Sequence, residues 1–495
     1  MNRILLILGI SFAFLGGFIS LNSDETVAAN SDDLFAIKTE PKQAIGNDRS
    51  SLASVRESII EFNYDAATLA RAETLPITVF DSKQYTAKSG NVEIRAIDDV
   101  TWRGKIETKN FSGDMFLTSR KGYVAGMIYT PDAVYEIVAK VDKQILVQLD
   151  QSLFPDCYGD VKGVAEAKIP AIAPQVGTDS GDMIDVLVVY STAVKNNVGG
   201  DVQARLLAQS AIDSANTAYL NSKIRQRLRL VHSEEIVYTE TASASTDLSN
   251  LRSNSTIAAM RNTYKADMVS MISESVGVCG IGYLLNSLSG SPTNAFTVTV
   301  RSCAVGNLSF AHELGHNMGS QHNPENGSGP VFPYSYGHYV NGSYRTVMSY
   351  ADPCTSGCSR VAYFSNPQVN YQGLSTGIDN QRDNARSIEQ TSDIIAAYRY
   401  SGKSLTLNNL NNKEIVPRNI SRTINWSSDG IGGNVRIELS RNESTNWETL
   451  IGSTPNDGSA VINIYGRPTK RARLRVVSLD ETAVSDSSIK NFSIK

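Results

Sequence analysis

Residues 312–322 read His-Glu-Leu-Gly-His-Asn-Met-Gly-Ser-Gln-His, and this stretch concentrates the chemistry of the 495-residue chain. His312 and His316 are four positions apart, so on a helix both imidazoles lie on one face and can bind one metal ion. Gly319 can adopt a positive φ and end that helix, which turns the chain so that His322 supplies a third nitrogen. Three protein ligands with one open position predict a catalytic zinc, because structural zinc is usually held by four ligands.

The acidic residue of this stretch has the position of a general base. Glu313 lies about 100° further round the helix than His312, so we expect its carboxylate beside the metal rather than bound to it. There it can take a proton from a zinc-bound water molecule and later deliver it to the leaving amine. The alternative, that the histidines are buried core residues, is disfavoured because three of the chain's five histidines fall in one ligand pattern. The other two, His232 and His338, are expected to have structural roles.

The full pattern HExxHxxGxxH resembles the zinc signature of the metzincin peptidases. Metzincins also have a tight turn whose methionine lies beneath the metal, and residues 346–350, Thr-Val-Met-Ser-Tyr, match it through Met348. The resemblance implies a twisted mixed sheet with an active-site helix, and a peptide substrate that pairs with an edge strand, for which residues 295–300 are the candidate. In some metzincins a tyrosine placed like Tyr350 ligates zinc or stabilises the oxyanion; packing behind the turn is the alternative.

Among metzincins, His-Glu-Leu-Gly-His-Asn-Met-Gly is most similar to the adamalysin/reprolysin branch, and the bacterial peptidyl-Asp metalloendopeptidases resemble this chain over most of 183–400. The stretches that carry this resemblance are Asp-Val-Leu-Val-Val-Tyr at 185–190, Arg-Leu-Arg-Leu-Val-His at 227–232, Ala-Asp-Met-Val-Ser-Met-Ile at 266–272, Cys-Gly-Ile-Gly-Tyr at 279–283 and Phe-Ser-Asn-Pro at 364–367. Asn323 departs from the branch, which usually has Asp after the third histidine. The departure weakens the assignment to the branch and leaves the metal ligands unchanged.

The peptidyl-Asp resemblance implies a preference for an acidic residue at P1′, the position after the scissile bond. An acidic side chain needs a cation in its pocket, preferably Arg, which can form a bidentate pair. Arg345 and Arg360, before and after the methionine turn, are the candidates. Ordinary surface or structural arginines are the alternative.

The rest of the sequence predicts a multidomain chain of a signal peptide and three folded units. Residues 1–29 have Arg3, an apolar run and a Val-Ala-Ala cleavage site, which indicates a signal peptide rather than an uncleaved anchor. Residues 30–178 alternate apolar and polar side chains, which predicts a strand-rich propeptide ending in a Pro/Gly/Ala linker at 168–181. Alternating strands and helices predict an α/β metzincin domain at 179–400, and short alternating runs predict an all-β Ig/fibronectin-III-like sandwich at 401–495.

Composition limits the partners. The chain has 46 basic and 50 acidic residues, no run of five Lys or Arg and a net charge of −4, so no nucleic-acid partner is expected. Beyond residues 1–29 no segment is apolar enough to span a bilayer, so it is not expected to be an integral membrane protein. Protein or peptide substrates and one zinc ion are expected, a structural calcium ion has no support in the sequence, and a monomer is presumed.

Five cysteines leave one unpaired. Four lie in the α/β unit and allow three pairings; Cys279–Cys303 with Cys354–Cys358 is favoured because the last two share one short loop. Cys157 remains, shortly before the linker, and its thiolate could fill the open position on the zinc and keep the precursor latent. A buried free thiol is one alternative. Another is an aspartate switch, because Phe-Ser-Gly-Asp at 111–114 resembles the switch of astacins.

These observations predict a secreted, extracellular zinc endopeptidase made as a latent zymogen, with the periplasm or cell surface as alternative locations. The competing function is an exported adhesin or binding protein whose metzincin domain is inactive. The intact Glu313 disfavours that alternative, because an inactive relative most simply loses its general base.

Overall fold

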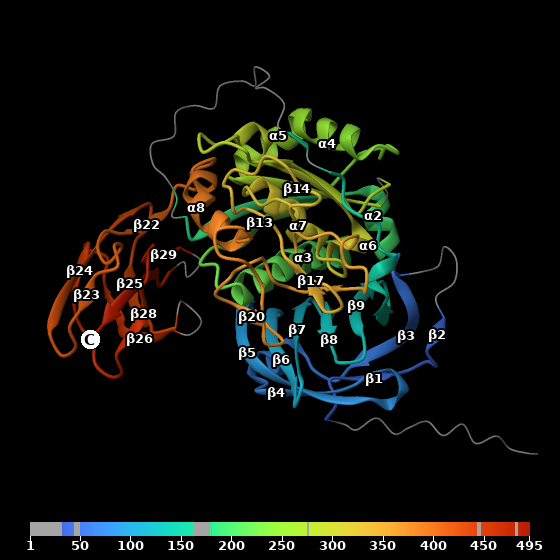
Figure 1. Cartoon of the computed structure of the whole chain (residues 1–495), viewed down its shortest axis with the longest axis horizontal. Coiled ribbons are helices and arrows are strands. Elements are labelled where there is room, and N and C mark those ends of the chain that lie inside the picture. The colour runs from blue at the N-terminus through green and yellow to red at the C-terminus, as the bar shows by residue number, and fades with distance from the viewer. Residues whose placement is uncertain are drawn as a thin grey trace, which may run out of the picture.

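The computed structural model describes residues 32–43, 50–159, 161–162, 179, 181–274, 277–442, 447–480 and 484–495 (Figure 1). The expected signal peptide at 1–29 and most of the expected linker at 168–181 lie outside these residues. Among the helices in the described part of the chain, none has the length and apolar character needed to cross a membrane.

The N-terminal unit, residues 32–162, is built on one antiparallel sheet in the order β1-β3-β10-β9-β8-β7-β6-β5-β4, with β2 paired to β3. Hairpins join most neighbouring strands, as the period-two alternation predicts. The elements are β1 (Phe35–Ile37), β2 (Lys42–Gln43), β3 (Ser54–Phe62), α1 (Ala66–Arg71), β4 (Thr74–Thr78), β5 (Gln84–Ala96), β6 (Asp99–Thr108), β7 (Phe111–Arg120), β8 (Tyr123–Tyr129), β9 (Val134–Lys140), β10 (Lys143–Leu149) and β11 (Val161–Lys162).

The α/β unit, residues 181–400, is built on a mixed sheet in the order β11-β15-β16-β14-β12-β13, whose first strand comes from the N-terminal unit. Strands β12, β13, β14 and β16 are parallel, and β15 is antiparallel to β16. The strands are β12 (Met183–Ser191), β13 (Arg227–Ile236), β14 (Met268–Ser273), β15 (Gly280–Leu284) and β16 (Phe296–Val300), followed by the short β17 (Tyr339–Val340), β18 (Tyr344–Arg345), β19 (Ser359–Arg360), β20 (Asn370–Tyr371) and β21 (Leu374–Ser375).

The expectation that residues 295–300 form the edge strand is wrong. β16 lies between β14 and β15, and β15 is the outermost strand that the α/β unit itself contributes. The sequence pattern does not predict β15 as a strand, because Gly280 and Gly282 have no apolar side chains. The close approach of Glu313 nevertheless requires glycine at both positions. A Cβ on Gly280 would lie 2.6 Å from the Glu313 carboxylate, and one on Gly282 would lie 2.9 Å from the Glu313 carbonyl oxygen.

The helices of the α/β unit are α2 (Thr192–Val198), α3 (Asp201–Asn221), α4 (Ala244–Ser253), α5 (Ser255–Thr263), α6 (Arg301–Ala304), α7 (Ser309–Asn317) and α8 (Asn384–Ala396). The apolar pattern at 248–264 predicts one helix, and the structure has two. They meet at Asn254, whose side chain accepts from the backbone N–H groups of Thr256 and Ile257 and so begins α5.

Helix α3 lies between two sheets. It contacts β13 on one side and β7 and β8 of the N-terminal sheet on the other (Figure 1). It is buried around its circumference, and small side chains let both sheets approach closely: Ala204, Ala208, Ala211, Ala215 and Ala218 are fully buried. One hydrophobic cluster therefore contains side chains from both units, among them Phe116 and Met127 from the N-terminal sheet.

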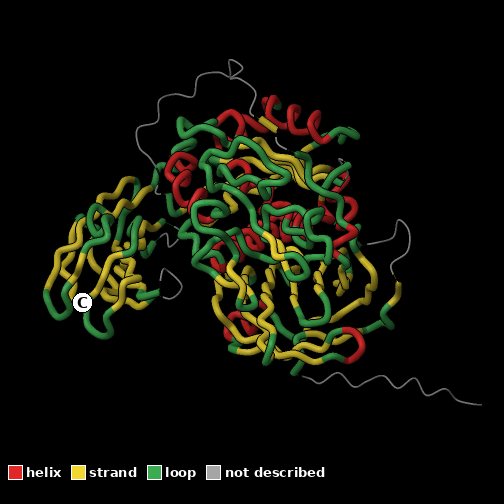
Figure 2. Tube along the Cα trace, in the orientation of Figure 1, coloured by secondary structure: helices red, strands yellow, loops and turns green. Residues whose placement is uncertain are grey.

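Residues 404–494 form the C-terminal unit, which consists of strands and loops (Figure 2). Two sheets have the orders β22-β24-β27 and β23-β30-β28-β25-β26, with β29 paired to β28, and one hydrophobic cluster draws side chains from both. The strands are β22 (Ser404–Leu407), β23 (Ile415–Val416), β24 (Ser421–Asp429), β25 (Asn434–Ser440), β26 (Glu448–Pro455), β27 (Ser459–Asn463), β28 (Thr469–Ser478), β29 (Ser485–Ser487) and β30 (Phe492–Ile494).

The disulfide pairing favoured from the sequence is confirmed. Cys279 is bonded to Cys303 and Cys354 to Cys358. Cys157 is the free cysteine, and it is buried.

Candidate metal centre

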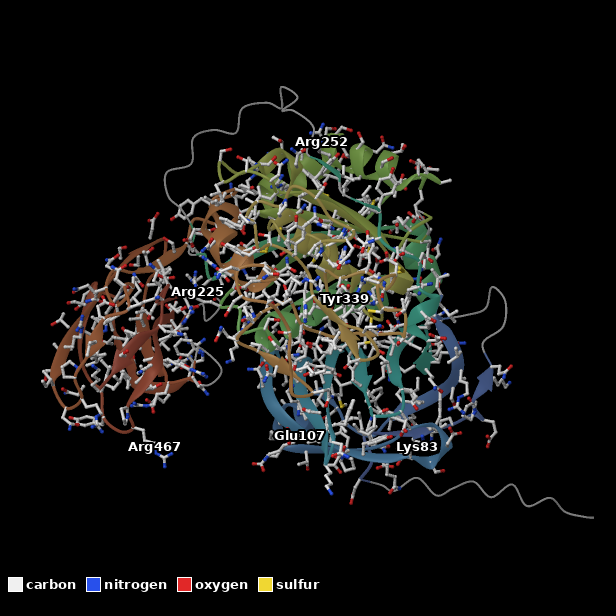
Figure 3. All side chains as sticks on the ribbon, viewed as in Figure 1. Lys83, Glu107, Arg225, Arg252, Tyr339 and Arg467 are labelled. Atoms are coloured by element: carbon white, nitrogen blue, oxygen red, sulfur yellow. A yellow bond between two sulfur atoms is a disulfide. The ribbon has the colours of Figure 1, made fainter. Side chains whose placement is uncertain are left out.

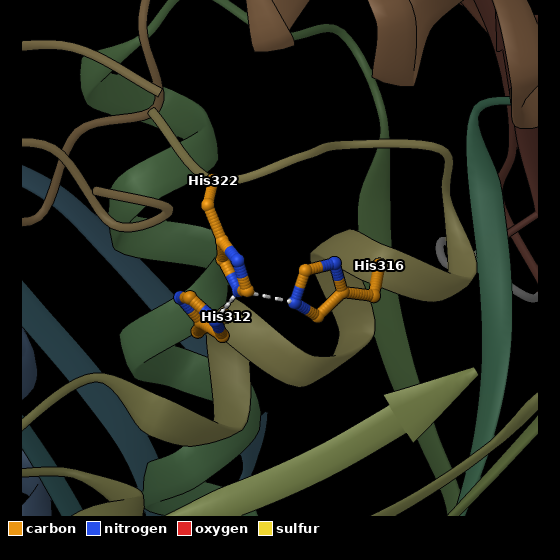
Figure 4. A group of neighbouring side chains, drawn as sticks. All are labelled: His312, His316 and His322. Carbon is orange, nitrogen blue, oxygen red and sulfur yellow. Dashed lines mark hydrogen bonds between the residues drawn. The ribbon is translucent and has the colours of Figure 1, made fainter. Parts of the chain in front are cut away.

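Three imidazoles converge on one point (Figure 4). His312 and His316 project from α7, and His322 projects from the loop after it. The Nε2 atom of His322 lies 3.1 Å from that of His312 and 3.0 Å from that of His316. Ligand nitrogens that bind a tetrahedral zinc ion at their usual bond lengths are about 3.3 Å apart, so the spacing suits such an ion.

Backbone carbonyls fix which ring nitrogen carries the hydrogen. The Nδ1 atoms of His312 and His316 each lie 2.9 Å from a carbonyl oxygen, those of Val347 and Ser320. A carbonyl oxygen can only accept, so each Nδ1 donates and each Nε2 presents a lone pair to the common point. Lone pairs that face one another at this distance repel unless a cation lies between them. The donor set therefore fits a divalent metal ion.

Burial favours the neutral form of His312 and His322. It lowers the pKa of His312 well below its ordinary value, and the neighbouring His316 and His322 lower it further. The pKa of His322 is lowered for the same main reason. Neutral imidazole is the form that binds a metal.

The end of α7 directs the third histidine. Gly319 has a φ of +82°, and its N–H donates to the carbonyl of His316 at 3.0 Å. The N–H of Ser320 reaches back to the carbonyl of Gly315 at 2.9 Å, which completes the left-handed helix end. The reversed chain then places His322 opposite the two helical histidines.

Glu313 lies beside the three histidines and is fully buried. Burial raises the pKa of its carboxyl group to about 8, and the Arg360 guanidinium opposes that rise. A bound divalent cation would oppose it too, because such an ion is the largest local charge in a site. The carboxylate is thus placed to hold or release a proton near neutral pH.

The methionine turn packs under the metal-binding helix. A Cβ on Gly315 would lie 2.6 Å from the Met348 sulfur, so only glycine lets the turn approach this closely. Sequence reasoning missed the role of Asn323, whose Oδ1 accepts the Tyr350 N–H at 3.0 Å. This bond joins the chain after the third histidine to the turn. The sequence drew attention to Asn323, because related proteins usually have Asp there, but it did not predict the hydrogen bond to Tyr350.

Tyr350 lies in the centre rather than behind the turn. Its ring centroid is 4.2 Å from that of His322, and its hydroxyl donates to the carbonyl oxygen of Cys157 at 2.9 Å. The N-terminal unit therefore contacts, through a peptide carbonyl, a side chain that packs against His322.

Cys157 also reaches the centre. Its sulfur, a His312 nitrogen and a Glu313 carboxylate oxygen all lie within 4.8 Å of one another. The residues around it run along the edge of the sheet: the Cys279 N–H donates to the Asp156 carbonyl at 3.2 Å, and β11 pairs in parallel with β15. Asp114, the alternative switch residue, is elsewhere and accepts from the Lys105 ammonium at 2.9 Å.

The two arginines proposed from the sequence are buried, so the surface interpretation is wrong for both. Arg345 is 3% exposed and Arg360 is 1% exposed. Each donates to the carbonyl oxygen of Ser349, next to Met348 in the turn. Burial lowers the pKa of Arg345 well below its ordinary value, and Arg360 adds to this effect. The Asp156 carboxylate of the N-terminal unit opposes this lowering of the Arg345 pKa.

The two remaining histidines lie outside the centre. His232 on β13 lies 2.9 Å from a Glu234 carboxylate oxygen and stacks on Tyr264. The backbone of His338 pairs with Thr346, and its Nδ1 lies 3.4 Å from the Arg382 guanidinium. Both contacts are of the structural kind that the sequence predicts.

Comparison with known proteins places this site in a family. The family model Reprolysin_5, described as metallo-peptidase family M12, matches residues 181–365, which contain the three histidines and the methionine turn. The peptidyl-Asp metalloendopeptidase of Xanthomonas campestris pv. campestris is 31% identical over 373 residues, which cover 71% of this chain and 87% of that protein. The protein of the same name from Stenotrophomonas maltophilia strain K279a is 28% identical over 420 residues, which cover 78% of this chain and 98% of that protein.

Proposed function

Because the chain belongs to the bacterial peptidyl-Asp metalloendopeptidase family of M12 metallopeptidases, and is a zinc metalloendopeptidase, we propose that His312, His316 and His322 hold its catalytic zinc. The observation that carries the proposal is the position of the His322 Nε2 atom, 3.1 Å from that of His312 and 3.0 Å from that of His316, with the three ligand atoms all within 4.8 Å of one another. When bound, the metal acts as a Lewis acid towards the scissile carbonyl and makes water a better nucleophile.

The protein's own groups supply the proton transfers and the orientation. Glu313 accepts the proton of the attacking water and returns it to the leaving amine; a bound cation opposes the effect of burial on its pKa and so favours the ionised form that a base needs. Tyr350 is a candidate donor to the oxyanion, because its hydroxyl already donates to a peptide carbonyl in front of the histidines. Strand β15 offers its edge to an extended substrate once β11 has left it.

The test of this proposal is Glu313→Gln, with Glu234→Gln on the exposed edge of β13 as the control. The variant should bind one zinc ion per molecule and lose peptidase activity by about 10²–10⁴-fold, the usual contribution of a general base. The control should keep both properties. A Glu313→Gln enzyme with more than a few per cent of wild-type kcat would refute the assignment of the base.

We further propose that Cys157 keeps the precursor latent by binding the zinc through its thiolate. Support comes from the position of its sulfur, within 4.8 Å of a His312 nitrogen and a Glu313 oxygen. Burial raises the pKa of the free thiol well above its ordinary value, and Glu313 adds to the rise. A bound cation reverses that preference, because coordination deprotonates a thiol outright.

An acidic P1′ preference is the proposed specificity. Arg345 and Arg360 are both buried, and the Asp156 carboxylate of the N-terminal unit raises the pKa of Arg345, so an anion is favoured beside this pair of guanidiniums. The names of the relatives, peptidyl-Asp metalloendopeptidases, agree with a carboxylate as that anion. Arg345 and Arg360 are therefore the proposed cations of the P1′ pocket.

The outer parts of the chain complete the proposal. Residues 1–29 are proposed as a signal peptide, 30–178 as a propeptide, 179–400 as the catalytic domain and 401–495 as an Ig/fibronectin-III-like sandwich that acts as a spacer or targeting unit. Secretion agrees with the two disulfides, which form in oxidising compartments. An inactive, adhesive role remains the competing proposal, and the absence of casein hydrolysis by processed, zinc-loaded protein would favour it.

A further inference from the structure

A carboxylate of the α/β unit is buried under the N-terminal unit. Asp213 on α3 has no exposed surface. Thr101 and Thr118 donate their hydroxyls to its Oδ2 at 2.6 and 2.8 Å, and both come from the N-terminal sheet. Within the α/β unit, the side chain that donates to this carboxylate is Gln209, at 3.3 Å.

Two arginines of the N-terminal unit complete this cluster. Arg95 reaches both carboxylate oxygens of Asp213 at 3.3 Å, and Arg103 reaches Oδ1 at 3.3 Å. Arg103 also donates to the Thr217 hydroxyl, one turn further along α3, at 3.1 Å. Removing the N-terminal unit would take away four of the five side chains that donate to Asp213 and would expose the carboxylate to water. Hydrogen bonds to a charged partner are stronger than neutral ones, so these four side chains join the two units at Asp213.

Other side chains also join the two units; Figure 3 draws the side chains of the described residues. Phe116 and Met127 pack in the hydrophobic cluster of the α/β unit. Gln151 bonds the backbone N–H of Arg360 at 2.7 Å, and Lys105 donates to the Tyr363 hydroxyl at 2.9 Å. These contacts come from residues 105–151, which all precede the linker in the sequence, so they do not depend on the continuity of the chain between the units.

In the sequence, the expected cleavage segment comes after every residue that the N-terminal unit contributes to these contacts. The last strand of the N-terminal unit, β11, ends at Lys162, and the Pro/Gly/Ala linker begins later in the sequence. A cut in the linker therefore leaves every contact described above in place. It leaves Cys157 in place as well.

We infer that the N-terminal unit stays bound to α3 after the linker is cut, as a tight non-covalent partner whose docking site is centred on Asp213. The inference rests on the proposed role of the unit as a propeptide. It adds that a single cut is not the activating event: the N-terminal unit must afterwards be degraded or displaced. The exposed face of α3 in the mature enzyme is then a binding surface for a second copy of that unit.

The experiment uses the full chain with a site for a sequence-specific protease inserted between residues 170 and 171. After complete cutting, the two fragments should elute together from a size-exclusion column at micromolar concentration and physiological salt. Asp213→Asn, which keeps the shape and removes the charge, should raise the dissociation constant by at least about 30-fold in a dilution series. If Asp213→Asn fails to fold, Thr118→Val replaces it and should raise the dissociation constant by a smaller factor.

The control is Arg56→Ala, which removes an exposed ion pair with Asp81 inside the N-terminal unit and touches no residue of α3. It should leave the dissociation constant unchanged. Fragments of the wild-type chain that separate at micromolar concentration overturn the inference, and so does an Asp213→Asn chain that binds as tightly as wild type. Fragments that co-elute while the cut chain is fully active support the docking and refute the proposed latency, so the two failures are distinguishable.

Discussion

At the scale of single residues, the centre is held by neutral backbone groups. His312 and His316 are oriented by carbonyl oxygens, and the carbonyl that orients His312 belongs to Val347 in the methionine turn. The turn is thus part of the proposed metal site, although its methionine is not among the proposed ligands. Loss of a partner of this kind typically lowers metal affinity by about 10–100-fold.

The bond from the Tyr350 N–H to Asn323 predicts a measurable effect on zinc. Asn323→Ala removes the acceptor that holds the turn beside His322, so zinc affinity should fall by about 10–100-fold. Asn323→Asp keeps an oxygen at the same place and should retain the wild-type affinity. Competition with a fluorescent chelator measures both. Equal affinity of Asn323→Ala and wild type would show that the turn is held by other contacts.

The buried arginines predict a specificity that paired substrates can measure. Wild-type enzyme should cleave a peptide with Asp at P1′ about 10–100-fold more efficiently than the same peptide with Asn, because a hydrogen bond to a charged partner is worth about 1.5–3 kcal/mol. Arg345→Met or Arg360→Met should reduce that ratio of kcat/KM towards one. Both peptides are measured with the same variant, so partial unfolding lowers both values of kcat/KM equally and leaves their ratio unchanged. A wild-type preference for apolar P1′ residues would contradict the proposal that Arg345 and Arg360 bind an acidic P1′ side chain.

At the scale of elements, local patterns predicted most strands and helices, and contacts between distant segments explain what was missed. The ligand helix, its glycine end and the methionine turn are predictable from residues close in sequence. Strand β15 was missed because Gly280 and Gly282 carry no apolar side chain, and their reason is the approach of α7 from elsewhere in the chain. The burial and the contacts of Asp213 could not be predicted from the sequence, because its partners Thr101 and Thr118 lie more than 90 residues away along the chain.

The segment around Cys157, which leads into β11, predicts how latency is released. Cys157→Ala in the uncut precursor should raise activity on a short peptide at least about tenfold, because the thiolate no longer fills the fourth position on the metal. Cobalt-substituted wild-type precursor should show a thiolate charge-transfer band that the variant lacks. Tyr158→Ala, the exposed neighbour, should change neither property. A precursor that stays latent without Cys157, with metal bound, would exclude the thiol as the switch.

At the scale of the whole molecule, the two units share one buried interface, and a second carboxylate lies in it. Glu136 on β9 is 6% exposed, and its Oε2 packs against Gly306, between α6 and α7, at 2.5 Å from where a Cβ would stand. Burial raises its pKa to about 8; Arg301 opposes the rise and Glu57 adds to it. Docking therefore favours the protonated form of this carboxyl group.

This group makes the folded chain less stable as the pH rises. The unfolded chain releases the Glu136 proton near pH 4.5 and the folded chain near pH 8, so between these values the folded state binds more protons and loses stability with increasing pH. The loss is on the order of a few kcal/mol. Glu136→Gln should remove this part of the pH dependence and raise the midpoint of thermal unfolding at pH 8 but not at pH 4.5. Glu61→Gln, at an exposed position on β3, is the control and should leave the profile unchanged. If Glu136→Gln shows the wild-type slope between these pH values, Glu136 is ionised in the docked state and the interface solvates it.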